Sequence, residues 1–290
     1  MTFVYLMIIG LQIGSIYALV ALGYSMVYGI VKLVNFAHGD IIMVGAYCVW
    51  YLTSRMSVPA WLAVPAAIVL CSFLGVMIEK IAYKPLRKSD RLALLVTAIG
   101  ISLFLQNAVQ IIFSADPRMF ANIFEGTIAI GDRQFSNATA VTIAASTLIM
   151  IGLSLLVKRT KIGKAMRTVS EDGEAAQLMG INVNNTISFT FALGSGLAAV
   201  GSVFYCCSYS QIQPTMGNML GLKAFVAAVL GGIGSIPGAM IGGVLIGITE
   251  SFTRGFISSQ LTDAVVFGIL IVVLLIRPSG IFGRNIGEKV

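Results

Sequence analysis

The sequence predicts an all-α fold, a polytopic bundle of membrane-spanning helices with about eight or nine segments and at least one broken helix. Apolar residues make up 57% of the chain and charged residues only 11%, against roughly 25% charged residues in soluble domains. The charges are clustered, and the longest interval without one runs from Ala175 to Leu222. Intervals of this kind supply the ~20 apolar residues that one crossing of a bilayer requires.

Eight apolar stretches are candidate spans. They are residues 3–28, 40–54, 59–82, 92–113, 138–157, 186–208, 222–254 and 261–276. No basic residue precedes the first stretch, which is also longer than the core of a signal peptide, so we expect it to be a retained span. We expect one membrane domain to occupy residues 1–290.

Loop charge predicts the orientation of these spans, because basic loops stay in the cytoplasm. The loop after the third span is basic, as are residues 158–185 and the C-terminal tail, so we place all three inside. The loop 114–137 carries a near-neutral mixture and suits the outside. If 222–254 crossed the membrane once, the number of crossings would put the basic tail outside, which conflicts with the inside position that its charge predicts.

A glycine-rich run with one proline, from Gly231 to Pro237 and Gly238, resolves this conflict. Proline and clustered glycines interrupt helices, and broken membrane helices are tolerated where protein buries them. We therefore expect 222–254 to be two segments hinged at this turn, with the N-terminus outside. The net charge of +7 follows from the basic inner loops and does not indicate a nucleic-acid partner.

Motifs for catalysis are missing from the sequence. His38 is the single histidine, so no second histidine exists for a metal site, and no HExxH or phosphate-binding Gly-x-x-x-x-Gly-Lys-Ser/Thr motif occurs. Ser195 between two glycines is more typical of close helix packing than of a protease. We expect neither an enzyme nor a cofactor or ATPase site in this chain.

Polar groups at membrane depth are the candidates for a transport pathway or for helix breaks, because exposing them to lipid is costly. The polar candidates are Lys32, Asp40, Lys223 and Glu250, together with Asn35 and His38. Gly234, Pro237 and Gly238 are candidates for the second helix break. For Glu250 the alternative is a residue at the membrane interface, and for Asn35 and His38 it is the capping of a broken helix. The segments 35–39 and 234–238 can be aligned, as in transporters built from two related halves, although chance similarity explains this equally well.

The most informative segment is the loop 158–185. Five basic residues are followed by a Glu-Ala-Ala-x-x-x-Gly sequence that begins at Glu174 and ends at Gly180. We expect a short helix that Asp172 caps and that Gly180 ends in a left-handed conformation. Ala175, Ala176 and Met179 would form a small apolar face that docks on a cytoplasmic partner.

This loop resembles the coupling loop of ABC importer permeases, although Ile187 is not followed by the proline that often occurs there. Three further stretches, Val27–Ile30, Asn35–Gly39 and Lys223–Gly243, resemble the permease subunit of high-affinity branched-chain amino-acid transporters. The likeness extends over essentially the whole chain. Permeases for urea and short amides share much of the pattern and remain an alternative, as does a stand-alone secondary carrier.

The resemblance implies an ABC importer permease fold in a bacterial inner membrane. A second, paralogous permease subunit would complete the pathway, two cytoplasmic ATP-binding subunits would drive it, and a periplasmic binding protein would deliver Leu, Ile or Val. ATP would be bound by the partners. Glu174, Ala175, Ala176 and Gly180 would make the contacts to the ATP-binding subunits.

Overall fold

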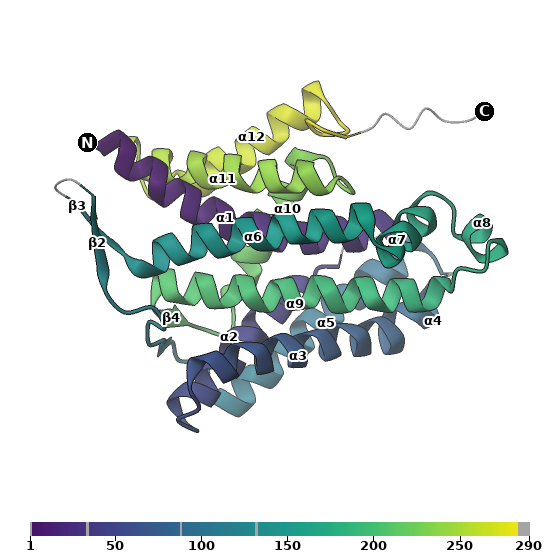
Figure 1. The fold of residues 1–290 in the computed structure, drawn as a ribbon, viewed down its shortest axis with the longest axis horizontal. Coiled ribbons are helices and arrows are strands. Elements are labelled where there is room, and N and C mark those ends of the chain that lie inside the picture. The colour runs from purple at the N-terminus through teal and green to yellow at the C-terminus, as the bar shows by residue number, and fades with distance from the viewer. Residues whose placement is uncertain (1, 33–34, 88, 131–132, 284–290) are drawn as a thin grey trace.

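The computed structural model describes residues 2–32, 35–87, 89–130 and 133–283. Helices dominate this part of the chain, and the long ones run roughly alongside one another (Figure 1). In chain order they are α1 (Thr2–Val31), α2 (His38–Ser54), α3 (Ala60–Ile78), the π-helical turn η1 (Glu79–Tyr83), α4 (Lys84–Leu86), α5 (Arg91–Phe113), α6 (Asn137–Arg159), α7 (Lys161–Glu171), α8 (Gly173–Leu178), α9 (Val183–Tyr209), α10 (Met216–Gly231), α11 (Ile236–Phe256) and α12 (Thr262–Ile276).

Short strands modify the expected all-α fold. The strands β2 (Thr127–Ile130) and β3 (Arg133–Ser136) form an antiparallel hairpin, and β1 (Arg118–Met119) pairs with β4 (Gln211–Ile212). The loop 114–137 was interpreted only by its charge, which carries no information about strand pairing. The fold is therefore mostly helical, with small β-ribbons at one end of the bundle (Figure 1).

Among the described residues, six helices are long and apolar enough to cross a membrane: α1, α3 with its continuation to Leu86, α5, α6, α9 and α11. The apolar helices α10 and α12 are shorter, and α2 has 17 residues. Length and composition thus support a multi-pass membrane protein, but they do not reach the predicted eight or nine crossings.

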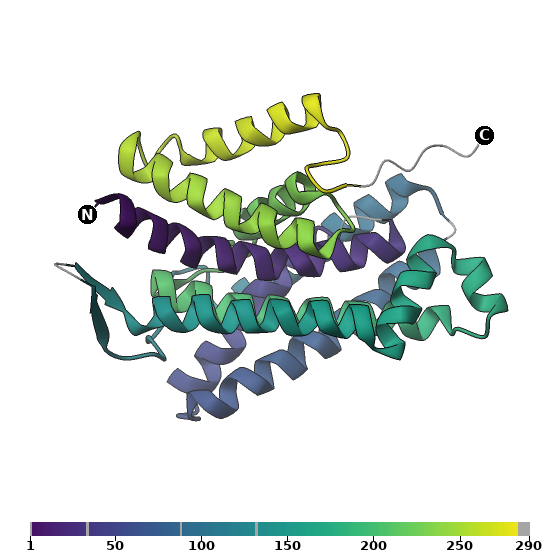
Figure 2. The same ribbon diagram turned by 45° about the horizontal axis from the view of Figure 1, so that its top comes forward.

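The core is built around α1, which packs along α11 and α9. Glycines bring α1 and α11 into backbone contact, since a Cβ built on Gly247 would lie 2.1 Å from the Gly14 nitrogen and one on Gly243 would lie 2.4 Å from the Ala18 Cα. Such close backbone approach is the usual role of small residues between membrane helices. Helices α12 and α3 lie at opposite edges of the bundle (Figure 2).

The predicted break in 222–254 is present: α10 ends at Gly231 and α11 begins at Ile236. The predicted start of this segment at residue 222 is wrong, because α10 begins at Met216. Gly217 and Gly221 lie within that helix and allow α10 to touch α2, as a Cβ on Gly221 would lie 2.8 Å from the Gly39 Cα.

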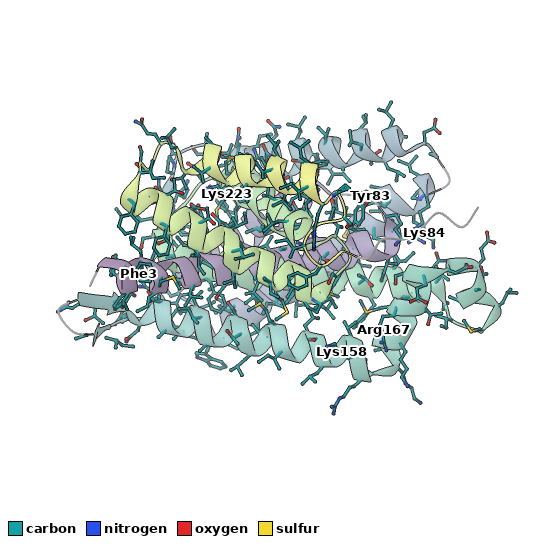
Figure 3. All side chains as sticks on the ribbon, turned by 90° about the horizontal axis from the view of Figure 1, so that it is seen from above. Phe3, Tyr83, Lys84, Lys158, Arg167 and Lys223 are labelled. Atoms are coloured by element: carbon teal, nitrogen blue, oxygen red, sulfur yellow. The ribbon has the colours of Figure 1, made fainter. Side chains whose placement is uncertain are left out.

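The two ends of the bundle differ in the segments that they carry. The start of α1 and the β2–β3 hairpin lie at one end, whereas α4, α7 and α8 lie at the other (Figure 1). The labelled Lys84, Lys158 and Arg167 lie toward the end opposite Phe3 (Figure 3). The basic segments that loop charge predicts to be cytoplasmic, those of α4 and α7, thus lie at the same end of the bundle.

Candidate coupling surface and helix breaks

Helix α7 occupies the first half of the segment that was expected to be a basic loop. The Thr160 hydroxyl accepts a hydrogen bond from the Gly163 amide at 3.0 Å and so caps the helix. Met166 and Val169 are buried, while Lys161, Lys164 and Arg167 are exposed, as are Lys158 and Arg159. One side of α7 thus attaches the segment to the bundle, and the other side is strongly basic.

Helix α8 begins and ends as the sequence predicted. One oxygen of Asp172 accepts hydrogen bonds from the amides of Glu174 at 2.9 Å and Ala175 at 3.0 Å. At the other end, Gly180 has φ +81°. The Ile181 amide donates to the Ala176 carbonyl at 3.0 Å and the Gly180 amide to the Gln177 carbonyl at 3.0 Å. These two bonds form a Schellman motif, which satisfies carbonyls that the helix end leaves free.

The predicted apolar docking face is wrong in one respect. Ala176 is fully buried, because α8 packs against α7 and α9 on that side, so it supports the helix and cannot reach a partner. Leu178 is 90% exposed and Met179 is 66% exposed. Leu178 was not among the residues predicted for this face, because the sequence does not show which side of α8 packs against α7 and α9.

A polar hollow adjoins this apolar tip. Its volume is about 460 Å³, and residues of the α8–α9 turn line it: Gln177, Gly180, Ile181, Asn182, Val183 and Asn184. The exposed acidic side chains of Glu171, Asp172 and Glu174 lie on the same segment as the basic face of α7. The surface combines an apolar knob with charges of both signs, which is suited to protein recognition. We call Leu178, Met179 and the lining of this hollow the coupling surface.

A polar cluster around the buried Glu79 connects the coupling surface to the bundle. The Arg87 guanidinium donates to the Asn184 side chain at 2.8 Å and forms an ion pair with Glu79. The other carboxylate oxygen of Glu79 accepts from the Ser188 hydroxyl at 2.6 Å. Glu79 is fully buried and opens the π-helical turn η1. Turns of this type are frequent at functional positions in helices.

The same π-helical turn reaches the first helix break. The Tyr83 hydroxyl donates to the Asn35 side-chain oxygen at 2.8 Å, and the Asn35 carbonyl accepts from the His38 amide at 3.1 Å. Within the described segments, no side chain caps α2, whose capping residue is Ala37, so Asn35 and His38 do not act as side-chain caps. Asn35 instead links η1 to the segment between α1 and α2.

His38 is a packing residue at the start of α2. It is 1% exposed and lies edge-on to Tyr24, with ring centroids 4.6 Å apart. A Cβ on Gly23 would lie 2.5 Å from its Nε2 atom, so the imidazole depends on the glycine for space. Nε2 has no hydrogen-bond partner within the described part of the chain.

The second break is held by backbone geometry and by distant segments. Gly232 and Gly234 have φ of +102° and +89°, which favours glycine, and the Ser235 hydroxyl caps α11 by accepting from the Gly238 amide at 3.2 Å. Pro237 lies in the first turn of α11, where its missing N–H is harmless. The Gly234 amide donates to the Ser25 hydroxyl of α1 at 3.0 Å.

Glu250 is the centre of a buried ionic cluster. One carboxylate oxygen lies 3.1 Å from the Lys223 nitrogen and 2.9 Å from the Arg254 guanidinium. The other oxygen accepts from the Tyr17 hydroxyl at 2.7 Å. Lys223 also pairs with Asp263 at 2.7 Å. With 1% exposure, Glu250 is not a residue of the membrane interface; it joins α1, α10, α11 and, through Lys223, α12.

Comparison with known proteins places these features in a family. Residues 6–275 match the family model described as "Branched-chain amino acid transport system / permease component". The chain is 42% identical to the high-affinity branched-chain amino acid transport system permease protein BraD of Pseudomonas aeruginosa, over 97% of this chain and 96% of that protein. It is also 42% identical to the permease protein LivH of Escherichia coli, with the same coverage.

More distant similarity extends to an archaeon and to one solved structure. The chain is 31% identical to a probable branched-chain amino acid transport permease protein LivH of Methanocaldococcus jannaschii, over 93% of this chain and 89% of that protein. The structure of PsaBC from Streptococcus pneumoniae in complex with Fab superposes with a TM-score of 0.49 and 14% identity, covering 93% of this chain and 91% of that chain.

Proposed function

The chain belongs to the family of branched-chain amino acid transport permease components, and we propose on this basis that it is the membrane-spanning subunit of an ATP-driven importer of Leu, Ile and Val. The observation that carries the proposal is the 42% identity over 97% of the chain to BraD. The names of the relatives favour branched-chain amino acids over urea or short amides. The chain would be a multi-pass protein of the bacterial inner membrane.

The importer would contain four kinds of component. This chain and a paralogous permease subunit would enclose the pathway, and two cytoplasmic ATP-binding subunits would drive transport. A periplasmic binding protein would deliver the amino acid at the end that carries the β2–β3 hairpin. This chain would bind no ATP and catalyse no reaction. It would bind the partner subunits, transmit their movement to the membrane helices and open a path for the amino acid.

The coupling surface would receive the ATP-binding subunit. Leu178 and Met179 would fill an apolar groove on the partner, and burying a Leu side chain of this exposure would contribute about 1.5–3 kcal/mol to docking. Glu174, Ala175 and Gly180 would lie at the edge of this contact. Ala176 would hold α8 against α7 and α9.

Movement of α8 would reach the membrane helices along two routes. One is the backbone of the α8–α9 turn. The other is the polar cluster that joins Asn184 to Arg87 and Glu79. From the π-helical turn that Glu79 opens, Tyr83 continues this route to Asn35. Closure of the ATP-binding subunits would therefore act on α9 and on the α1–α2 break together, which is the requirement for alternating access.

Uptake in cells tests this function. Bacteria that lack their own branched-chain importer receive this chain with its partner subunits, and uptake of labelled leucine is measured with excess isoleucine or urea as competitor. We expect leucine uptake that isoleucine blocks and urea does not. An inactive ATP-binding subunit should abolish it. Uptake that survives this inactivation would support a secondary carrier, and an absence of leucine uptake by an assembled complex would refute the proposed substrate.

A further inference from the structure

A cavity of about 370 Å³ lies between α2, α5 and α10, beside Tyr24 of α1. The face of α5 that borders it is formed by Leu95, Ile99, Ser102, Leu103 and Gln106. These positions are separated by one, three or four residues and therefore lie on one side of the helix. The face changes along α5 from apolar to polar. A volume of this size is within the range of small-molecule sites in proteins.

A buried carboxylate, that of Asp40, lies behind the polar end of the cavity, where it is bonded to the lining residue Gln106 and does not itself line the cavity. The side-chain nitrogen of Gln106 donates to Asp40 at 2.9 Å and to Asn218 at 2.8 Å, and it lies 3.1 Å from the Ser102 hydroxyl. An amide group has two protons, so the first two contacts use both. Asp40 is 1% exposed, and its second oxygen has no partner within the described residues. A buried carboxylate in this state favours an additional donor.

The same region contains the beginnings of two helices. Gly39 and Gly217 are the second residues of α2 and α10, and both border the cavity. A Cβ on Gly217 would lie 2.2 Å from the Gly39 carbonyl oxygen, so the two helix starts are in contact. Helix N-termini carry partial positive charge, and broken membrane helices present such ends to anionic groups of substrates.

The cavity thus offers complementary charges to a zwitterion. Asn218 and Ser102 at the cavity surface, and Asp40 behind Gln106, supply acceptors for a group with several N–H donors. The helix starts at Gly39 and Gly217, which directly precede Asp40 and Asn218, supply a positive potential beside them. No Lys or Arg is among the residues that line it. Beyond the polar end, Ile99, Leu103 and Phe225 provide an apolar surface.

We propose that this cavity holds the transported amino acid within the membrane, with its ammonium group on Asp40 and Asn218 and its carboxylate at the starts of α2 and α10. The Gln106 amide occupies the ammonium position when the site is empty and turns aside when the amino acid enters. The branched side chain lies against Ile99 and Leu103. The inference rests on the proposed function, and it explains why an uncharged amide would be a poor ligand for the same cavity.

The test uses the complete importer in proteoliposomes with the loaded binding protein outside and ATP inside. Wild-type leucine uptake is measured first, because its absence would refute the proposed function and not the site. In an Asp40→Asn complex we expect leucine uptake to fall at least tenfold, while ATP hydrolysis stimulated by the loaded binding protein remains within twofold of wild type. The matched control is Asn107→Ala on the adjacent position of α5, whose exposed side chain bonds its own helix; it should leave uptake unchanged.

A second pair of variants tests the cavity without removing a charge. Ile99→Trp should fill the cavity and block uptake, whereas Ile111→Trp, at an 85% exposed position of the same helix, should not. If Asp40→Asn does not assemble, this pair decides the question. Normal uptake by an assembled Asp40→Asn complex, or by Ile99→Trp, would overturn the proposal.

Discussion

The Arg87 guanidinium and the Asn184 side-chain oxygen lie 2.8 Å apart and join the end of α4 to the first turn of α9. Asn184 also borders the coupling surface, and Arg87 is paired with the buried Glu79. A single arginine therefore contacts both the segment that would receive the ATP-binding subunit and the π-helical turn that bonds to Asn35. Loss of this residue should affect stability and coupling together.

Replacing Arg87 with Met should leave the Glu79 carboxylate buried without its cation. Removing one partner of a buried ion pair typically costs about 3–5 kcal/mol. We expect a lower thermal midpoint for the detergent-solubilised complex and reduced uptake per ATP hydrolysed. The double variant Glu79→Gln with Arg87→Met should recover much of the midpoint, because no uncompensated charge remains. A double variant as unstable as the single one would contradict this explanation.

Replacing Leu178 with Asp should weaken binding of the ATP-binding subunits without destabilising the permease, since the side chain is 90% exposed. Co-purification of the ATP-binding subunits measures this loss, and the thermal midpoint of the isolated permease should stay unchanged. Ala176→Asp provides the contrast. Because Ala176 is fully buried, its replacement should lower the midpoint itself. If Leu178→Asp and Ala176→Asp changed co-purification and the thermal midpoint to the same extent, the assignment of the exposed tip to docking would be wrong.

Replacing Gly180 with Ala should strain the end of α8, because a residue with a Cβ at φ +81° costs about 1–2 kcal/mol. No atom lies within 4 Å of the added Cβ, so the effect is conformational and not steric. We expect a partial reduction of ATP-driven uptake. Gly173→Ala, at the other end of α8 and with equally open surroundings, is the matched control and should have no effect. An uptake loss of the same size in both would exclude backbone strain as the cause.

Variants of the Glu250 cluster should differ in a predictable order. Tyr17→Phe removes one hydrogen bond and should destabilise by about 1 kcal/mol. Glu250→Gln leaves Lys223 and Arg254 without their shared carboxylate and should destabilise by about 3–5 kcal/mol. Thermal midpoints of the two variants, measured in one detergent, check the order. A smaller loss for Glu250→Gln than for Tyr17→Phe would contradict the assignment of Glu250 as the centre of the cluster.

Features that depend on local chemistry could be predicted from the sequence. The break between α10 and α11 follows from Gly232, Gly234 and Pro237, and both ends of α8 follow from Asp172 and Gly180. The division of loops between the two ends of the bundle follows from their charge. These features need only neighbouring residues, so a linear pattern contains them.

Features that depend on distant contacts could not be predicted. The partners of Glu250 come from Tyr17, Lys223 and Arg254, and only the packing of α1, α10 and α11 brings them together. Which side of α8 faces the bundle depends on α7 and α9, so the roles of Ala176 and Leu178 were not evident. The start of α10 at Met216 was not predicted, and the contact of its Gly217 and Gly221 with α2 is not visible in a linear pattern.

ATP hydrolysis should drive transport through α8, and a single reconstitution tests this coupling. Leucine uptake and ATP hydrolysis are measured in the same proteoliposomes for wild type and for Gly180→Glu, with equal amounts of assembled permease. We expect the wild type to couple the two, and Gly180→Glu to lose at least 90% of ATP-driven uptake because a strained, charged residue disrupts the end of α8. Full uptake by Gly180→Glu at normal assembly would contradict the assignment of the coupling surface.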